Sequence, residues 1–156
     1  MLSIDIPGFG LLELEHLVLD VNGTLAQDGE VPVYTEEFLD PLKPLLAIHA
    51  ITADTYGGVG KMLEPLGLDV RVIGDGREAE AKLDLVDELG SQGVVAIGNG
   101  ANDELMLRDA AVGIAVIGME GAASSAIAAA DIVVTSLEAA LGLLIDPRRM
   151  IAALRR

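Results

Sequence analysis

Short apolar runs alternate along this chain with runs in which apolar and polar residues recur at helical spacing. The apolar runs, each suited to one buried strand, are 17–19, 48–52, 70–73, 94–97, 113–117 and 132–134. The helix-like runs between them are 35–47, 57–66, 77–89, 102–109, 122–129 and 137–144. This alternation predicts an α/β fold: a three-layer α/β/α, Rossmann-like parallel sheet within one domain that spans residues 1–156.

Two shorter patterns add detail near the start of the chain. Residues 11–15 predict an additional strand at the edge of the sheet. Residues 27–33 contain Asp28-Gly29, a pair typical of tight hairpin turns. A hairpin at this place would overhang the end of the first strand at residue 19 or 20.

Composition narrows the class of protein. The chain has 156 residues, of which 51% are hydrophobic, so we expect one folded core and no disorder. No apolar run reaches the roughly 18 residues of a membrane span, and the first ten residues do not resemble a signal peptide. The chain has no cysteine, which excludes disulfides and thiolate chemistry. We therefore expect a cytoplasmic protein.

The formal net charge of −15 changes the picture further. A surface of this sign repels nucleic acid and anionic membranes, so we expect neither as a partner. A phosphate site would need local positive charge from a cation, a lysine or backbone N–H groups. We interpret the four arginines near the end of the chain as a solvated helix end rather than a binding patch; they are Arg148, Arg149, Arg155 and Arg156.

The run Leu17-Val18-Leu19-Asp20-Val21-Asn22-Gly23-Thr24 combines a buried strand with polar groups at its carboxyl end. Open α/β sheets bind their ligands at this edge, and a carboxylate there can act as a phosphoryl-accepting nucleophile. Gly23 permits a tight turn, and Thr24 offers a hydroxyl and an N–H to a phosphate oxygen. The alternative is that Asp20 merely precedes an ordinary turn.

Polar residues also follow other predicted strands. Thr52 ends the second strand within Ala50-Ile51-Thr52-Ala53-Asp54, and Lys82 lies early in a helix. The fourth strand leads into Gly98-Asn99-Gly100-Ala101-Asn102-Asp103. Because parallel strands end at one edge of the sheet, these groups can converge with Asp20.

These four motifs, in this order, resemble those of the haloacid dehalogenase-like (HAD) hydrolase superfamily. Asp20-Val21-Asn22-Gly23-Thr24 is similar to the first motif, Asp-x-Asp-Gly-Thr, except at its third residue. Residues 98–103 resemble the fourth motif, Gly-Asp-Gly-x-Asn-Asp. Thr52-Ala53-Asp54 and the Asp131-Ile132-Val133-Val134 segment resemble P-type ATPase phosphorylation domains. The resemblance therefore implies a capless member closest to soluble P-type ATPase-like phosphatases.

The resemblance implies a Mg²⁺-dependent phosphohydrolase that acts on a small phosphorylated substrate through an aspartyl-phosphate. Asp20, Asn22 and Lys82 occupy the catalytic positions. Mg²⁺ would be held by Asp20, the carbonyl of Asn22, Asn99 and Asp103. Residues implied in substrate binding are Gly23, Thr24, Thr52, Ala53, Lys82 and Asn102.

Each of these assignments has a simpler alternative. Thr52 could merely end a strand, and Lys82 could form a solvated ion pair with Glu78, Glu80 or Asp84. Asp103 could merely be an acid that the first helical turn favours. Asn102 is as readily interpreted as a helix cap.

Two departures from the family pattern bear on the chemistry. Asn22 stands where phosphatases of the family have an aspartate that protonates the leaving group and activates water. An amide does neither, and loss of such help typically costs 10²–10⁴-fold in rate. Asn99 also replaces an aspartate, so we expect weaker metal binding. Slow hydrolysis or a long-lived phospho-enzyme follows, and a good leaving group such as an acyl phosphate would need no acid.

The spacing leaves no room for a cap domain. Residues 25–51 and 56–81 are used by the predicted hairpin, helices and one strand, so the site should be open, and a homo-oligomer could supply a lid. Two other functions stay open: a phosphate- and Mg²⁺-binding regulatory module with little or no turnover, and a structural subunit of an assembly. His16 and His49 are each interpreted as isolated structural residues.

Overall fold

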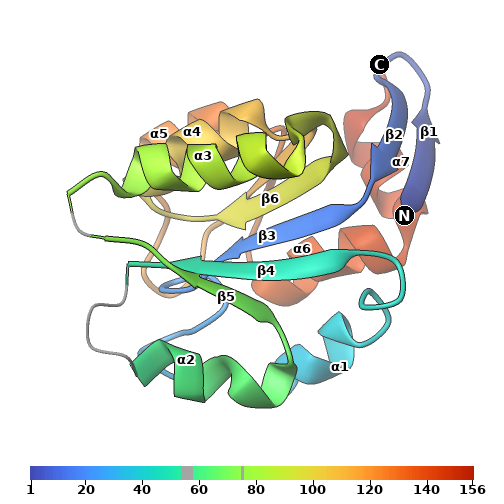
Figure 1. The fold of residues 1–156 in the computed structure, drawn as a ribbon. Helices are drawn as coiled ribbons and strands as arrows, with labels where there is room; N and C mark the ends of the chain where they lie inside the picture. The colour runs from blue at the N-terminus through green and yellow to red at the C-terminus, as the bar shows by residue number, and fades with distance from the viewer. Residues whose placement is uncertain (54–57, 75) are drawn as a thin grey trace.

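The computed structural model of the chain describes residues 1–53, 58–74 and 76–156. Its main sheet has six parallel strands in the order β5-β4-β3-β6-β7-β8 (Figure 1). The strands are β3 (His16–Asp20), β4 (Ala47–Thr52), β5 (Asp69–Val72), β6 (Val94–Gly98), β7 (Val112–Val116) and β8 (Ile132–Val134). The predicted parallel α/β sheet is confirmed.

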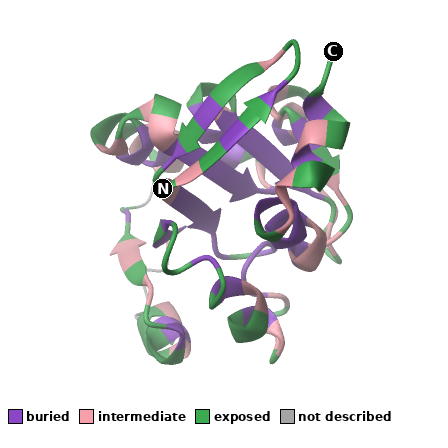
Figure 2. Cartoon of the chain, turned by 90° about the vertical axis from the view of Figure 1, so that its right-hand side faces the viewer, coloured by how far each residue is buried: buried purple, intermediate pink, exposed green. Residues whose placement is uncertain are grey.

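Helices cover both faces of this sheet. One face carries α3 (Glu78–Leu89), α4 (Glu104–Asp109) and α5 (Ser124–Ala129), and the other carries α1 (Thr35–Leu39), α2 (Gly58–Leu63) and α6 (Leu137–Ile145) (Figure 1). Single-turn 3₁₀ helices at Glu64–Leu66, Ser91–Gly93 and Ala101–Asp103 complete the connections. Side chains of β3 alternate between the two cores, with Val18 in one and Leu17 and Leu19 in the other. Figure 2 shows the sheet as the buried centre of the molecule.

The strand expected at residues 11–15 belongs to a different sheet. β2 (Gly10–Leu14) pairs antiparallel with β1 (Leu2–Ile6), and the two form a separate ribbon rather than an edge of the main sheet. The ribbon packs on α7 (Pro147–Leu154), and Ile4, Ile6 and Leu14 bury its inner face. Regular alternation made this strand visible in the sequence, but pairing partners are set by tertiary packing.

Two further expectations need correction. The helix predicted over 35–47 ends at Leu39, because Pro41 and Pro44 interrupt the helical ladder, and turns lead from there into β4. Arg148 and Arg149 lie at the N-terminal rather than the C-terminal end of α7, and both form ion pairs with Asp146, whereas Arg155 and Arg156 follow its last residue.

The Asp28-Gly29 turn is present, with Gln27 and Glu30 exchanging two backbone hydrogen bonds of 2.9 and 3.0 Å. Asp28 and Gly29 both have positive φ, 51° and 79°, as a tight hairpin turn requires. The turn carries only isolated bridges and no long strands, so it is a short loop beside the end of β3.

The two histidines are not isolated from each other. His16 Nδ1 lies 3.1 Å from His49 Nε2, and His49 Nδ1 lies 2.9 Å from Asp69 Oδ2. Burial, and then the charge of His49, lower the pKa of His16. These residues lie far apart in the sequence, and the pairing of β3, β4 and β5 brings them into contact.

Strand order places a crevice at one point of the sheet. From β3 the chain moves outward on one side to β4 and β5, then returns to β6 on the other side of β3. In a doubly wound sheet such a reversal opens a crevice at the carboxyl ends of the two strands, here those of β3 and β6. Asp20 ends β3, and Gly98 ends β6.

Candidate active site

Lys82 lies between two carboxylates at this crevice. Its ammonium Nζ donates to Asp20 Oδ1 and to Asp103 Oδ1, each at 2.6 Å. All three side chains are buried: the residues are 6% (Asp20), 1% (Lys82) and 0% (Asp103) exposed. A strand, a helix and the 3₁₀ turn after β6 thus deliver one group each to the same point.

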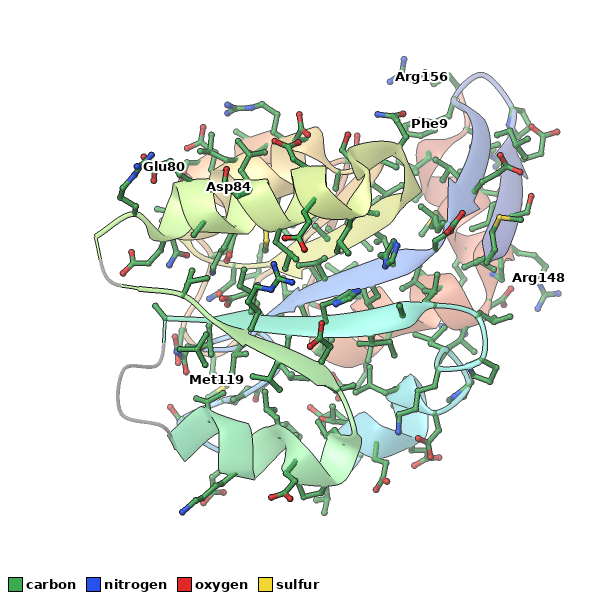
Figure 3. All side chains as sticks on the ribbon, viewed as in Figure 1. Phe9, Glu80, Asp84, Met119, Arg148 and Arg156 are labelled. Carbon is green, nitrogen blue, oxygen red and sulfur yellow. The ribbon has the colours of Figure 1, made fainter. Side chains whose placement is uncertain are left out.

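The burial of Lys82 decides between its two interpretations. α3 turns Lys82 toward the sheet together with Leu85 and Val86, which are buried in the same core. Figure 3 shows Glu80 and Asp84 on the outer side of α3, away from the sheet. Lys82 therefore belongs to the buried constellation and not to a solvated helix face.

Asp103 is held by three donors. Its Oδ2 accepts the backbone N–H groups of Asn99 and Gly100 at 2.9 and 2.8 Å, while Oδ1 accepts Lys82. Glycine at position 98 makes room for it, because a Cβ there would lie 2.5 Å from Asp103 Cγ. The absence of a side chain at Gly98 thus serves the placement of the Asp103 carboxylate.

The electrostatics leave the crevice short of positive charge. Burial, and then the negative charge of Asp103, raise the pKa of the Asp20 carboxyl to about 7, although Lys82 opposes both effects. Burial lowers the pKa of the Lys82 ammonium, but the two carboxylates outweigh it and hold that pKa above its usual value. Two buried carboxylates thus share one buried cation.

Thr24 is tied into the protein. Its hydroxyl donates to Asn99 Oδ1 at 3.3 Å, and its N–H donates to the Val21 carbonyl at 3.2 Å. The Gly23 N–H donates to the Ala26 carbonyl at 2.8 Å. The hydroxyl of Thr24 thus joins the β3 turn to the β6 turn, and the two N–H groups close the turn after β3.

The remaining predicted residues lie around the crevice. Thr52 is buried at the end of β4, one position beyond Ile51, the residue that pairs with Asp20. Ala53 follows it half-buried, and Asp54 lies outside the described residues. Asn22 is exposed at the mouth. Asn102 does not cap α4, whose preceding residue is Asp103; its Oδ1 instead accepts Lys82 at 3.4 Å.

A turn after β7, which was not among the predicted site residues, completes the rim. Gly118 and Gly121 form an isolated bridge, and Asn99 Nδ2 donates to the Gly121 carbonyl at 3.4 Å. Glu120 Oε2 lies 2.8 Å from the point where a Cβ on Gly23 would stand. Its place just after a strand of the sheet was the one available signal, since that edge carries the ligands.

The oxygen donors of the crevice suit a hard divalent cation such as Mg²⁺. Candidate ligands are the carboxylates of Asp20 and Asp103, the amide oxygen of Asn99 and the main-chain oxygen of Asn22. The raised pKa of Asp20 marks a deficit of positive charge that such a cation would relieve. Within residues 1–53, 58–74 and 76–156, no three acidic or histidine side chains cluster as metal ligands, so amide and carbonyl oxygens would have to contribute.

Solved structures with a similar fold are HAD superfamily proteins. The 3-deoxy-D-manno-octulosonate 8-phosphate phosphatase of Moraxella catarrhalis, crystallised with magnesium, phosphate and its sugar, has a TM-score of 0.72 at 19% identity, over 90% of this chain and 91% of that one. A putative HAD hydrolase (subfamily III A) of Legionella pneumophila gives 0.72 at 18%, over 91% and 87%. The chain therefore has the HAD-like fold.

The catalytic domain of the CPx-ATPase CopB-B is a more distant neighbour, with a TM-score of 0.60 at 22% identity over 74% of this chain and 45% of that one. The expected likeness to P-type ATPase domains is thus present at the level of fold. In the described parts of the chain, no helix combines the length and apolarity that a membrane crossing requires.

One curated sequence is closely related. The uncharacterised protein MJ0073 of Methanocaldococcus jannaschii is 46% identical over 84 residues, which are 51% of this chain and 90% of that protein. No protein-family model matches the chain.

Proposed function

The chain belongs to the family of the uncharacterised archaeal protein MJ0073 and has the HAD-like fold, and from this premise we propose that it is a Mg²⁺-dependent phosphohydrolase acting through Asp20. The observation that carries the proposal is the Lys82 ammonium 2.6 Å from both Asp20 and Asp103. These groups lie at the switch point of the sheet, where ligands of this architecture bind. The phosphatases among the structural neighbours support the same reaction class.

In the proposed reaction, a carboxylate oxygen of Asp20 forms a bond to phosphorus while the bond to the leaving oxygen breaks. The leaving group departs with the electron pair. Water then attacks phosphorus, the bond between phosphorus and the Asp20 oxygen breaks, phosphate leaves with the protons of the water, and the Asp20 carboxylate is regenerated. Burial keeps other nucleophiles away from the acyl phosphate.

Lys82 has two tasks in this scheme. Its positive charge partly offsets the burial and the Asp103 charge that raise the pKa of Asp20, and it stabilises the charge on the phosphoryl oxygens during transfer. Thr52 at the end of β4 is our second candidate for a phosphoryl contact. Asp103 holds Lys82 in place and is itself held by two backbone N–H groups.

Mg²⁺ bound by Asp20, Asp103, Asn99 and the Asn22 carbonyl would supply the missing positive charge of the site. Asn22 cannot protonate a leaving group, because an amide carries no transferable proton at neutral pH. We therefore propose slow hydrolysis of ordinary esters and faster transfer from acyl phosphates, whose leaving carboxylate needs no proton.

The test is the intact mass of the protein after incubation with acetyl phosphate and Mg²⁺. We expect one added phosphoryl group in the native protein and none in Asp20→Ala. Asp28→Ala, which removes an exposed carboxylate of the nearby turn, is the matched control and should be phosphorylated. Equal phosphorylation of the Asp20 variant would refute the proposal.

A second function is favoured by Asn22 and Asn99 together, since each replaces a carboxylate of the family pattern. On this alternative the protein binds phosphate and Mg²⁺ as a regulatory module without turnover. Beryllium fluoride with Mg²⁺ imitates an aspartyl-phosphate and distinguishes the two. Tight binding in a protein that hydrolyses no phosphate compound would favour the regulatory module.

A further inference from the structure

A separate pocket of about 330 Å³ opens at the same edge of the sheet as Asp20. Its walls come from the segments that follow β3, β7 and β8, so all of them lie beyond the carboxyl ends of the strands. Figure 3 shows Met119, one of its wall residues, on the side of the molecule where the strands end. The volume is that of a site for a small organic group.

The pocket and the candidate active site share two segments of chain. Gln27 lines the pocket and lies in the loop whose first turn contains Gly23. Gly118 also lines it, and a Cβ on Gly118 would lie 3.3 Å from the Gly23 carbonyl oxygen. A compound with its phosphate at Asp20 therefore has this pocket beside it.

Glu138 supplies the chemistry of the pocket wall. In the described part of the chain its Oε2 is buried and has no hydrogen-bond partner. It lies in the first turn of α6, two positions after the capping residue Ser136, where the helix dipole favours a negative charge. Burial, and then the neighbouring Glu138 carboxylate, raise the pKa of the Tyr34 phenol.

Oε2 is closed to solvent, so a donor bound in the pocket would reach it once the half-buried Glu138 side chain turns toward the pocket. The bond would then recover the free energy that an unpartnered carboxylate oxygen costs. Two kinds of group can donate to it, a hydroxyl and an ammonium, and the charge-assisted bond from an ammonium is the stronger. Ile117 and Met119 on the opposite wall offer apolar contact to the carbon skeleton that carries such a group.

We propose that this pocket binds the organic part of the substrate and that Glu138 selects phosphate esters bearing a hydroxyl or ammonium donor. The inference rests on the proposed phosphohydrolase function. It assigns specificity to Glu138, a residue outside the four motifs, and it gives the substrate class as small polyol or amino-polyol phosphates.

The experiment compares kcat/KM for three probes: glucosamine 6-phosphate, glucose 6-phosphate and phenyl phosphate, which lacks donors. In Glu138→Gln we expect the ratio of glucosamine 6-phosphate to phenyl phosphate to fall at least fivefold. If kcat/KM relative to phenyl phosphate falls for glucosamine 6-phosphate alone, the result identifies ammonium recognition. If it falls for both sugar phosphates, the result identifies hydroxyl recognition. Glu13→Gln, which changes an exposed glutamate of β2, should leave kcat/KM of each sugar phosphate relative to phenyl phosphate unchanged.

Unchanged ratios in Glu138→Gln would overturn the inference and leave the phosphohydrolase proposal standing. If the native protein hydrolyses none of the probes and is not phosphorylated by acetyl phosphate, the proposed function fails instead. Equilibrium dialysis of glucosamine 6-phosphate and glucose 6-phosphate then tests the pocket alone. At least fivefold weaker binding of either probe to Glu138→Gln supports it, and equal or absent binding refutes it.

Discussion

Asp20 combines two properties that rarely coexist in one side chain: it is buried, and it faces both a cation and a second carboxylate. The cation alone would lower its pKa, but burial and Asp103 outweigh Lys82 and raise it to about 7. Asp20 in the metal-free protein is therefore protonated over a pH range in which an unfolded chain would have it ionised.

This shift gives a prediction about stability. Because the folded pKa lies above the unfolded value of 3.8, Asp20 stabilises the fold below about pH 4 and loses that contribution as pH rises to about 7. In EDTA, the free energy of unfolding of Asp20→Asn relative to the native protein should rise over this range, by an amount on the order of a few kcal/mol. Urea titrations between pH 4 and 8 measure it. A constant difference across that range would contradict the assignment.

A second prediction concerns the exposed amide of Asn22. If the missing proton donor limits turnover, Asn22→Asp should raise kcat on phenyl phosphate at least tenfold, since general acid–base help is typically worth 10²–10⁴-fold. The gain on acetyl phosphate should be smaller, because its leaving group needs no proton. Equal gains on both substrates would point to an effect on binding instead of proton transfer.

At the level of elements, the approach of α4 to β7 depends on one glycine. A Cβ on Gly113 would lie 2.1 Å from the Leu107 carbonyl oxygen, which belongs to the backbone of α4 and cannot turn aside. Movement of α4 would disturb the preceding 3₁₀ turn, which ends at Asp103. The packing of one helix on one strand is thus linked to the geometry of the site.

We therefore expect Gly113→Ala to lower the free energy of unfolding by about 1–3 kcal/mol, the usual cost of overpacking. Gly60→Ala is the matched control, because Gly60 lies within α2 with open space around its Cα, and it should be neutral or slightly stabilising. Thermal denaturation of the two variants provides the comparison. Equal stabilities would mean that α4 moves without cost.

At the scale of the whole molecule, the net charge of −15 opposes compaction. Salt screens this repulsion over about 10 Å at 0.1 M. We expect the Tm of the metal-free protein to rise by several degrees between about 10 and 300 mM NaCl. A Tm that stays constant or falls would show that the negative charges are already offset locally.

The homo-oligomer remains a prediction, to be measured by sedimentation.

Some strands and helices could be predicted from the sequence, and others could not. The buried runs of β3, β6 and β7 were evident because a parallel sheet covered on both faces requires continuous apolar residues. Pro41 and Pro44 ended a helix early although the apolar pattern continued past them. The β1 strand was missed, because its pairing with β2 is antiparallel and lies outside the α/β alternation.

The sequence by itself determined the order of strands and helices, and with it the four polar motifs that a parallel sheet collects at one edge. Tertiary structure alone decided that Lys82 points inward between Asp20 and Asp103, because the outer side of α3 carries polar residues too. It alone brought Glu138 and Tyr34 together at one pocket, since residues remote along the chain become neighbours only when the strands are ordered in space.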